Sequence, residues 1–228
     1  EVKRMLGAYS RFIPRGLNEI VMVSMYMNAI DLARLQVSLG QFPCPHMPVV
    51  MPPKVAPDFE LRKKLEILHE GTEFELLLVE LIPMQMPTAY LESYSWLKKE
   101  ADRVFPKNPK VIVSVNAHIT NEGFKIWSAD RREKGAKLVG TQHGGHYGNA
   151  LWSANETHEL KVADRYFSWG WDGEKTSAVT PLASVQLAGT QKRIHFDSQG
   201  GILWLGASRP RYSAWMLSAH VGQQMLEY

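Results

Sequence analysis

The sequence predicts an α/β fold with a parallel sheet, and three observations in its second half support this. Short runs of β-branched and apolar residues, typical of buried strands, occur at residues 110–115, 136–141 and 165–169. A stretch with helical, amphipathic periodicity at residues 121–134 lies between the first two runs. A strand, a helix and a strand in succession form the unit from which parallel sheets with right-handed crossovers are built.

The first half of the chain, including residues 1–73, is expected to be mostly helical. Residues 18–37 are apolar nearly throughout and contain no proline, which favours a helix. Five prolines between residues 42 and 53 then impose an extended connector. Helical periodicity returns over residues 58–97, and Pro83 and Pro87 divide this stretch into at least two helices.

The elements after the second predicted strand continue the alternation. A helix is expected from Trp152, the strand at residues 165–169 follows it, and a Gly/Asp turn comes at residues 170–173. A further strand is expected at residues 201–207, and it leads into a final helix. This alternation of strands and helices therefore favours an α/β architecture throughout the second half of the chain.

A domain boundary is predicted near residue 192, because residues 192–201 are polar and rich in turn formers. Residues 1–192 are then one α/β domain. Residues 193–228 are a linker with the first strand and helix of a second, truncated domain.

Composition excludes several classes of protein. The chain has 228 residues, of which 45% are hydrophobic and 21% charged, and its apolar runs stop well short of the ~20 residues of a membrane span. No leader sequence is visible before Tyr9, and the single cysteine, Cys44, excludes an internal disulfide and a cysteine-based metal site. A cytoplasmic protein is therefore expected.

The charge of the chain says more about small ligands than about nucleic acids. The net charge is +3, and the lysines and arginines are scattered along the sequence. This pattern does not indicate binding to nucleic acid. It suits an anionic small ligand and an anionic lipid surface equally well.

Polar residues follow the predicted strands where a parallel sheet binds its ligands. Asn116 and His118 follow the first strand, the glycine-rich loop at residues 142–148 follows the second, and Ser208, Arg209 and Arg211 follow the strand at residues 201–207. The carboxyl ends of parallel strands share one edge of the sheet, so these loops are expected to converge on one cleft. The candidates for substrate binding are Asn116, His118, Gln142, Gly144, Gly145, His146, Tyr147 and Glu159.

Glu122 and His143 are the two catalytic candidates. Glu122 opens the predicted helix at residues 121–134 and could act as a general base or a nucleophile, although the helix dipole alone also favours a first-turn glutamate. His143 lies in a strand-end loop, where sites are common, and its imidazole transfers protons near neutral pH. A turn held together by histidine side chains is the alternative.

Two further groups of polar residues were considered, a possible zinc site and a set of side chains on the helix after Trp152 that could reach back to the cleft. His143, His146, His158 and Glu159 are residue types that bind zinc, but their spacing matches no standard metal motif. A solvated helix face also accounts for the polar side chains of residues 156–159.

Ser208, Arg209 and Arg211 follow the strand at residues 201–207 and precede a helix. Backbone amides and guanidinium groups in this arrangement suit a phosphate or a carboxylate. A surface turn with incidental arginines is the alternative.

Several segments occur in a recognisable order, namely residues 111–117, 122–127, 135–139, 142–148, 158–159, 163–171 and 208–213. Together they resemble a family of bacterial transferases associated with gene clusters for O-antigen and other surface polysaccharides. The likeness covers about residues 74–228. The chain is also distantly similar to β-Kdo transferases and capsule-synthesis proteins, whose Gln-His-Gly loops lie at the cleft.

The resemblance implies a glycosyltransferase of the GT-B type, with two Rossmann-like domains facing across a cleft. Residues 1–192 would be the acceptor-side domain, and residues 193–228 would begin the donor-binding domain. Glu122 and His143 would deprotonate the acceptor or stabilise the sugar cation, and the segment from Ser208 to Arg211 would hold the leaving phosphate.

The resemblance also implies the substrates and the setting of this enzyme. The donor would be a nucleotide sugar, and the acceptor a glycan or lipid-linked glycan at the cytoplasmic face of the inner membrane, with peripheral contact to that surface. Because GT-B enzymes generally need no metal, the resemblance implies no metal and no cofactor beyond the donor, and the lack of an Asp-x-Asp run is consistent with this. The 228 residues alone are expected to have little activity.

Two positions depart from the family pattern, and two other functions remain open. Asn121 stands where relatives usually have aspartate, which puts a catalytic aspartate in doubt but leaves Glu122 in place. His146 stands where relatives often have glycine, so it is a weaker candidate than His143. The alternatives are a polyol-phosphate transferase of the teichoic-acid type and a non-catalytic module that binds a nucleotide or glycan.

Overall fold

The computed structural model describes residues 14, 16–44, 49–65, 70–172, 178–187, 190, 194–195, 197–201 and 204. The chain divides into two compact units, Glu1–Gly189 and Thr190–Tyr228. In the second unit, the backbone N–H of Gly200 donates to the carbonyl of Asp197 in a turn. The strand and helix expected after residue 200, with Ser208, Arg209 and Arg211, lie outside the described residues.

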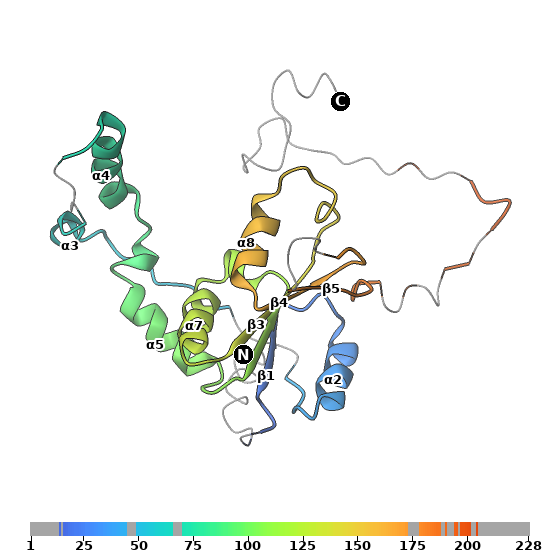
Figure 1. Cartoon of the computed structure of the whole chain (residues 1–228). Helices are drawn as coiled ribbons and strands as arrows, with labels where there is room; N and C mark the ends of the chain where they lie inside the picture. Colours follow the sequence, from blue (N-terminus) through green and yellow to red (C-terminus); the bar gives the residue numbers. More distant parts are fainter. Residues whose placement is uncertain are drawn as a thin grey trace. The chain divides into compact units, whose positions relative to one another are not determined.

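A five-stranded parallel sheet forms the centre of the first unit (Figure 1). The strands lie side by side in their sequence order, and each neighbouring pair is parallel. They are β1 (Ile20–Val23), β2 (Val111–Ser114), β3 (Lys137–Thr141), β4 (Arg165–Ser168) and β5 (Val179–Pro181). The predicted α/β class and the predicted strand-helix-strand unit are confirmed, and the sheet is compatible with a Rossmann-like fold.

Helices connect the strands, and most of them begin at a side chain that caps them. The helices are α2 (Ala29–Ser38), α3 (Phe59–Lys63), α4 (Glu73–Gln85), the 3₁₀ turn η1 (Thr88–Tyr90), α5 (Tyr94–Val104), α6 (Ala117–Thr120), α7 (Glu122–Glu133) and α8 (Ala154–Val162). Asn121 accepts a hydrogen bond from the N–H of Phe124 at the start of α7, and Ser153 accepts one from Glu156 at the start of α8. Such caps satisfy amides that have no partner inside the helix.

The helix expected over residues 18–37 is wrong in its first part, which forms strand β1. Val21, Met22 and Val23 are all buried, and β1 pairs along its length with β2. A strand buried on both faces shows no alternation of polar and apolar residues, so periodicity alone does not separate it from a buried helix. Asn28 then caps α2, which provides the helix for the remainder.

Two further differences concern the position of Pro83 and the short strand β5. Pro83 lies inside the last turn of α4 rather than at its end, and the helix stops at Gln85, two residues before Pro87. The division of residues 58–97 into several helices is nevertheless confirmed. Strand β5 was not expected, because only three residues form it and one of them is a proline.

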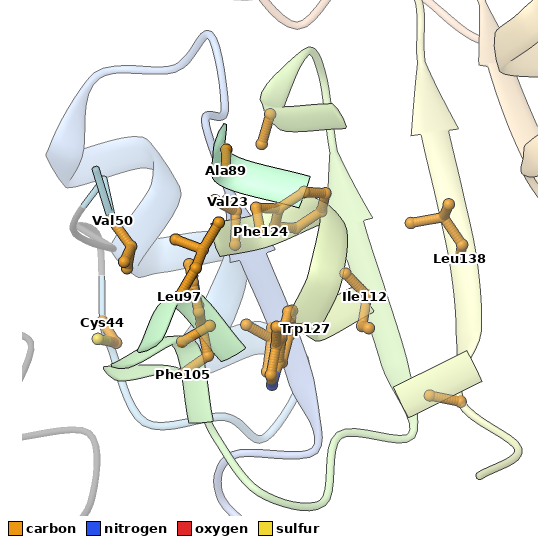
Figure 2. Close-up of a cluster of buried hydrophobic side chains, with 14 residues drawn as sticks. Val23, Cys44, Val50, Ala89, Leu97, Phe105, Ile112, Phe124, Trp127 and Leu138 are labelled. Atoms are coloured by element: carbon orange, nitrogen blue, oxygen red, sulfur yellow. The ribbon is translucent and has the colours of Figure 1, made fainter. Parts of the chain in front are cut away.

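The apolar core lies between the sheet and the pair of helices α5 and α7 (Figure 2). Val21, Ile112 and Leu138 are register partners on successive strands, and all three belong to this core. On the helix side, the rings of Phe105 and Trp127 stack with centroids 4.8 Å apart.

No helix in the described part of the chain is both long enough and apolar enough to cross a bilayer.

Candidate functional site

Glu159 on α8 is a buried carboxylate surrounded by four polar aromatic side chains. Its side chain is 2% exposed. One oxygen, Oε1, lies 3.1 Å from Nε2 of His143 and accepts a hydrogen bond of 2.8 Å from the hydroxyl of Tyr147. The other oxygen, Oε2, accepts a hydrogen bond of 2.9 Å from Tyr166. Nε2 of His118 lies 3.2 Å from Oε1, off the axis of a hydrogen bond.

These five residues, here called the Glu159 cluster, come from four different parts of the fold. His118 lies on α6, directly after β2, and the hydroxyl of Ser114 accepts the N–H of Ala117 in the turn between them. His143 and Tyr147 lie in the loop after β3, and Tyr166 lies in β4 itself. The expected convergence of the loops after the first two predicted strands is therefore observed for His118 and His143.

The contacts around Glu159 keep it ionised. Burial would raise the pKa of its carboxyl group, but the contacts from His118, His143 and Tyr147 outweigh burial and lower the pKa to about 2. The negative charge in turn acts on its neighbours. Burial, together with the Glu159 charge and hydrogen bonds, raises the pKa of Tyr147 and of Tyr166, so both phenols stay protonated and remain donors.

The hydrogen bonds also select one tautomer of His143. The hydroxyl of Tyr147 donates its proton to Glu159, so it acts only as an acceptor toward Nε2 of His143, which is 2.7 Å away. Both neighbours of Nε2 are then acceptors, and Nε2 must hold the proton. In the neutral imidazole, Nδ1 is then the nitrogen that carries the lone pair, on a side chain that is 15% exposed. This is the arrangement of a histidine base that a carboxylate orients.

Asn116 reaches the cluster through Tyr26, which follows β1. The side-chain amide of Asn116 donates to the hydroxyl of Tyr26 over 2.7 Å. The ring of Tyr26 meets the ring of His143 edge to face, with centroids 6.3 Å apart. The first strand thus also contributes a side chain to this edge of the sheet.

Gln142 holds the glycine-rich loop in place. Its buried side chain accepts hydrogen bonds from the backbone N–H of Trp169 and from the indole N–H of Trp171, both at 2.8 Å, and donates to the carbonyl of Gly144. It thereby ties the loop after β3 to the loop after β4. Gly148 belongs to the same contact, because its φ is +75° and a Cβ there would lie 2.8 Å from the ring of Trp171.

The remaining loop residues lie nearer the surface. His146 is exposed, and its ring packs on Tyr147 with centroids 4.3 Å apart. A Cβ at Gly144 would be 3.3 Å from the His146 ring, whereas one at Gly145 would meet nothing within 4 Å. His146 therefore contacts Tyr147 of the cluster and is not one of the residues that contact Glu159.

Glu122 is held by a separate set of partners. Its oxygens lie 2.6 Å from the ammonium group of Lys125 and 2.6 Å from the hydroxyl of Tyr90, and this hydrogen bond raises the pKa of Tyr90. Among the described residues, no hydrogen bond or ion pair joins Glu122 to the Glu159 cluster. The two catalytic candidates of the sequence are therefore not part of one network.

A metal centre is not formed by the residues considered for zinc. Within the described ranges, no group of three or more His, Cys, Asp and Glu side chains is arranged to hold a metal ion. His158 is exposed on α8, and its ring lies 6.1 Å from that of His118.

The sequence did not indicate two members of this site, and it left the role of a third open. Tyr26 carries no sequence signal of function, and Tyr166 has one only as part of the segment at residues 163–171 that resembles the family, because a tyrosine in a strand or after one is usually only a packing residue. Glu159 was a substrate-binding candidate whose alternative was a solvated helix face, and its burial rules out that alternative. The polar neighbours of Glu159 are distant in sequence, so no local pattern indicates its burial.

Comparison with known proteins gives one match. The family model described as "LIC12162 family transferase" matches residues 2–228, which is nearly the whole chain. It therefore extends through the first 73 residues, where the sequence motifs showed little likeness. No curated protein and no solved structure matches the chain.

Proposed function

Because the chain belongs to the LIC12162 family of transferases, we propose that it is a glycosyltransferase whose acceptor-side catalytic centre is the Glu159 cluster. The donor would be a nucleotide-activated sugar and the acceptor a bacterial surface polysaccharide of the O-antigen or capsule type. The parallel sheet is compatible with one Rossmann-like half of a GT-B enzyme. The observation that supports this proposal most is the buried carboxylate shared by two histidines.

His143 is the general base in this proposal. Its Nδ1 lone pair would accept the proton of an acceptor hydroxyl while the hydroxyl oxygen attacks the anomeric carbon of the donor. The bond from that carbon to the donor phosphate would break, and the phosphate would leave with the bonding electron pair. Ser208, Arg209 and Arg211 remain the proposed groups that hold this phosphate.

Glu159 is a positioning residue, since it acts on the substrate only through His143. Its charge holds Nε2 protonated and stabilises the imidazolium that forms when Nδ1 takes a proton. Glu122 is a poorer base in this arrangement, because a base must have an accessible lone pair and its two oxygens are already engaged by Lys125 and Tyr90.

The same geometry accommodates other members of the substrate class. His118 lies 3.2 Å from the shared carboxylate oxygen and is 12% exposed, so it can contact a second hydroxyl of the acceptor. A polyol-phosphate transferase of the teichoic-acid type, with a CDP-polyol as its donor, would use the same base. The donor therefore has to be identified by experiment, and peripheral contact with the inner membrane remains part of the proposal only for a lipid-linked acceptor.

The proposal is tested with His143→Ala in the complete natural polypeptide that contains these residues. Transfer would be assayed with CMP-, UDP-, GDP- and dTDP-sugars and with a CDP-polyol, after a thermal-shift screen for the nucleotide that binds. We expect kcat to fall by about 10²- to 10⁴-fold, since this is what general-base catalysis contributes. Binding of the nucleotide should remain unchanged.

His195→Ala is the matched control, because this histidine is exposed and lies in the second unit. Full transfer by His143→Ala would overturn the role of His143. Turnover with the CDP-polyol alone would replace the sugar donor by a polyol-phosphate donor. Nucleotide binding without transfer in the unmodified protein would favour the binding module.

A further inference from the structure

Helix α4 has an apolar surface that the described part of the chain leaves almost entirely in contact with solvent. Within Glu73–Gln85, all of which the structure describes, Pro83 alone is buried and Val79 alone is partly buried. Phe74 is 66% exposed and Met84 is 70% exposed. A helix that is apolar around most of its circumference is normally buried. An exposed apolar surface of this extent therefore marks a place where another surface packs.

The apolar side chains of α4 include a continuous stripe along one face. Phe74, Leu78 and Leu81 are spaced at i, i+4 and i+7, which is the spacing of the contact positions in a coiled coil. Leu77 and Ile82 flank these three, one on each side, at 3.6 residues per turn. All five side chains are exposed, and together they are here called the α4 stripe.

The chain holds α4 by the face opposite to this stripe. Pro83 lies about half a turn around the helix axis from the middle of the α4 stripe. Its carbonyl accepts a hydrogen bond of 2.6 Å from Nη1 of Arg62 on α3. The other guanidinium nitrogens of Arg62 donate to both oxygens of Glu92, at 2.7 and 3.0 Å, and both side chains are buried. This bidentate pair fixes α4 on α3 with the α4 stripe facing away from the contact.

The charges around the α4 stripe are all negative. The charged residues of α4 are Glu73, Glu75 and Glu80, and the sequence has no lysine or arginine at residues 65–97. Helices that lie in a membrane surface carry lysine or arginine beside their apolar face, because cytoplasmic lipid head groups are anionic. An apolar protein surface therefore fits α4 better than a lipid bilayer does.

A second copy of the chain matches both the apolar side chains and the charges when the two α4 helices run antiparallel. A two-fold axis then places Leu78 of one copy opposite the partner's Leu81. The two Glu75 carboxylates lie about 13 Å apart along the helix axis, beyond the ~8 Å over which salt screens exposed charges. A parallel pair would instead place the Glu75 carboxylates side by side and align the two helix dipoles unfavourably.

The size of the α4 stripe also suits a dimer. Covering the stripe and the adjoining side chain of Met84 in two copies would bury on the order of 1,000 Å² in total, which is the size at which specific interfaces begin. Homodimer interfaces are also more apolar than other protein interfaces, as this stripe is.

We propose that the α4 stripe is a dimer interface, in which α4 of one copy packs antiparallel against α4 of a second copy of this chain. No residue of the Glu159 cluster belongs to this interface. The proposal does not depend on the transfer reaction, so either can fail without the other.

Analytical ultracentrifugation of the 228-residue chain over a range of concentrations tests the dimer. The test variant is Leu78→Glu/Leu81→Glu, which places two carboxylates of each copy in the contact. The control is Ile30→Glu/Val37→Glu, which makes the same change of charge on α2, where Ile30 is 65% and Val37 is 59% exposed. All four positions are exposed, and circular dichroism checks that both variants fold.

We expect the unmodified chain and the control to dimerise with a Kd in the micromolar range. Dimerisation of the test variant should weaken by at least about 100-fold, because its carboxylates would be buried without partners. A monomer at the highest concentration of the unmodified chain would overturn the proposal, as would an unchanged Kd in the test variant. A monomer that sediments with phosphatidylcholine vesicles would assign the stripe to a bilayer and would overturn the dimer as well.

Disulfide crosslinking tests the antiparallel arrangement, in which Phe74 of one copy lies opposite the partner's Gln85. The variants Phe74→Cys and Gln85→Cys should form a covalent dimer when they are mixed and oxidised, whereas neither should do so alone. The unmodified chain is the control for Cys44, which is buried. Covalent dimers formed by each variant alone would show parallel helices and would overturn the arrangement proposed.

Discussion

The two buried regions of the first unit stabilise it by opposite means. The apolar core between the sheet and helices α5 and α7 consists of aliphatic side chains and stacked aromatic rings around Trp127 (Figure 2). The Glu159 cluster buries a carboxylate among imidazoles and phenols. Burial of apolar surface is favourable by itself, whereas a buried carboxylate costs several kcal/mol unless its partners compensate.

This difference separates a structural region from a candidate site. A position that served only stability could hold a well-packed apolar side chain at no loss. The Glu159 cluster instead requires a correct partner for each polar atom, and that requirement holds His143 in one tautomer. Perturbed carboxylates with specific partners are typical of functional sites, although structural networks also contain them. The following substitutions test how much the apolar core and the Glu159 cluster each contribute to stability.

The largest effect is expected in the apolar core, from Trp127→Ala. Trp127 is 1% exposed, stacks on Phe105 and donates its indole N–H to the carbonyl of Pro106 over 2.9 Å. We expect the free energy of unfolding to fall by about 3–5 kcal/mol, as for other large aromatic deletions. Urea denaturation followed by fluorescence measures this loss. Trp152→Ala is the control, because Trp152 is 73% exposed and should change stability by less than about 0.5 kcal/mol.

Glu159→Gln should remove a stabilising contribution that depends on pH. The folded carboxyl has a pKa of about 2, below its ordinary value of 4.5, so its contribution is present above about pH 4.5 and is lost as the pH falls toward 2. We expect a loss of about 3 kcal/mol near neutral pH and little difference from the unmodified protein near pH 2. Melting temperatures across this pH range measure it.

The control for the pH profile is Glu133→Gln, since Glu133 is exposed at the end of α7. It should leave the pH dependence unchanged. An acid transition that survives in Glu159→Gln would show that other carboxylates cause it, and the Glu92 pair with Arg62 would be the next to examine, because that arginine lowers the pKa of Glu92 to about 2.

Gly148→Ala tests how rigidly the loop of the Glu159 cluster is held. The residue has a φ of +75°, and a Cβ would lie 2.8 Å from the Trp171 ring, which Gln142 fixes by a hydrogen bond. We expect a loss of about 2–3 kcal/mol, from the left-handed backbone and the close contact together. Gly145→Ala in the same loop has open space and should cost less than about 1 kcal/mol. Similar losses in both variants would show that the contact with Trp171 is unimportant.

The smallest effect is expected from Tyr166→Phe. This change removes the hydroxyl that donates to Oε2 of Glu159 over 2.9 Å and leaves the packing of the ring in place. A hydrogen bond to a charged group is worth about 1.5 kcal/mol, so a loss of that size is expected in urea denaturation. Tyr94→Phe on α5 serves as control because Tyr94 is exposed. No difference between the two variants would mean that water replaces the hydroxyl at Oε2.

The predictable part of the fold is the part with regular periodicity. The amphipathic stretch at residues 121–134 predicted α7 to within one residue at each end, because Asn121 caps it and apolar residues recur along one face. The runs at residues 110–115 and 136–141 predicted β2 and β3. Strand β1 was missed because it is buried on both faces, and burial on both faces is decided by the strands and helices around it.

The candidate site was predictable at its loops and not at its centre. His118, His143 and Glu159 were named from the order of strands and loops, and they meet around one carboxylate. Tyr26 and Tyr166 reach the same place from β1 and β4, and no local pattern distinguishes them from packing tyrosines. Glu122, in contrast, was named from its place at a helix start, which a structural role explained equally well, and the structure pairs it with Lys125 and Tyr90.

The amino-acid sequence by itself determined the α/β class, the parallel unit around β2 and β3 and the loops that hold the histidines. These follow from local periodicity and from the rule that parallel strands share one carboxyl edge. Only the tertiary structure decided that Glu159 is buried, that Tyr166 and Tyr26 join its surroundings, and that Glu122 pairs with Lys125 and Tyr90. Burial and charge pairing depend on residues far apart in sequence, and the folded chain alone brings them within hydrogen-bond distance.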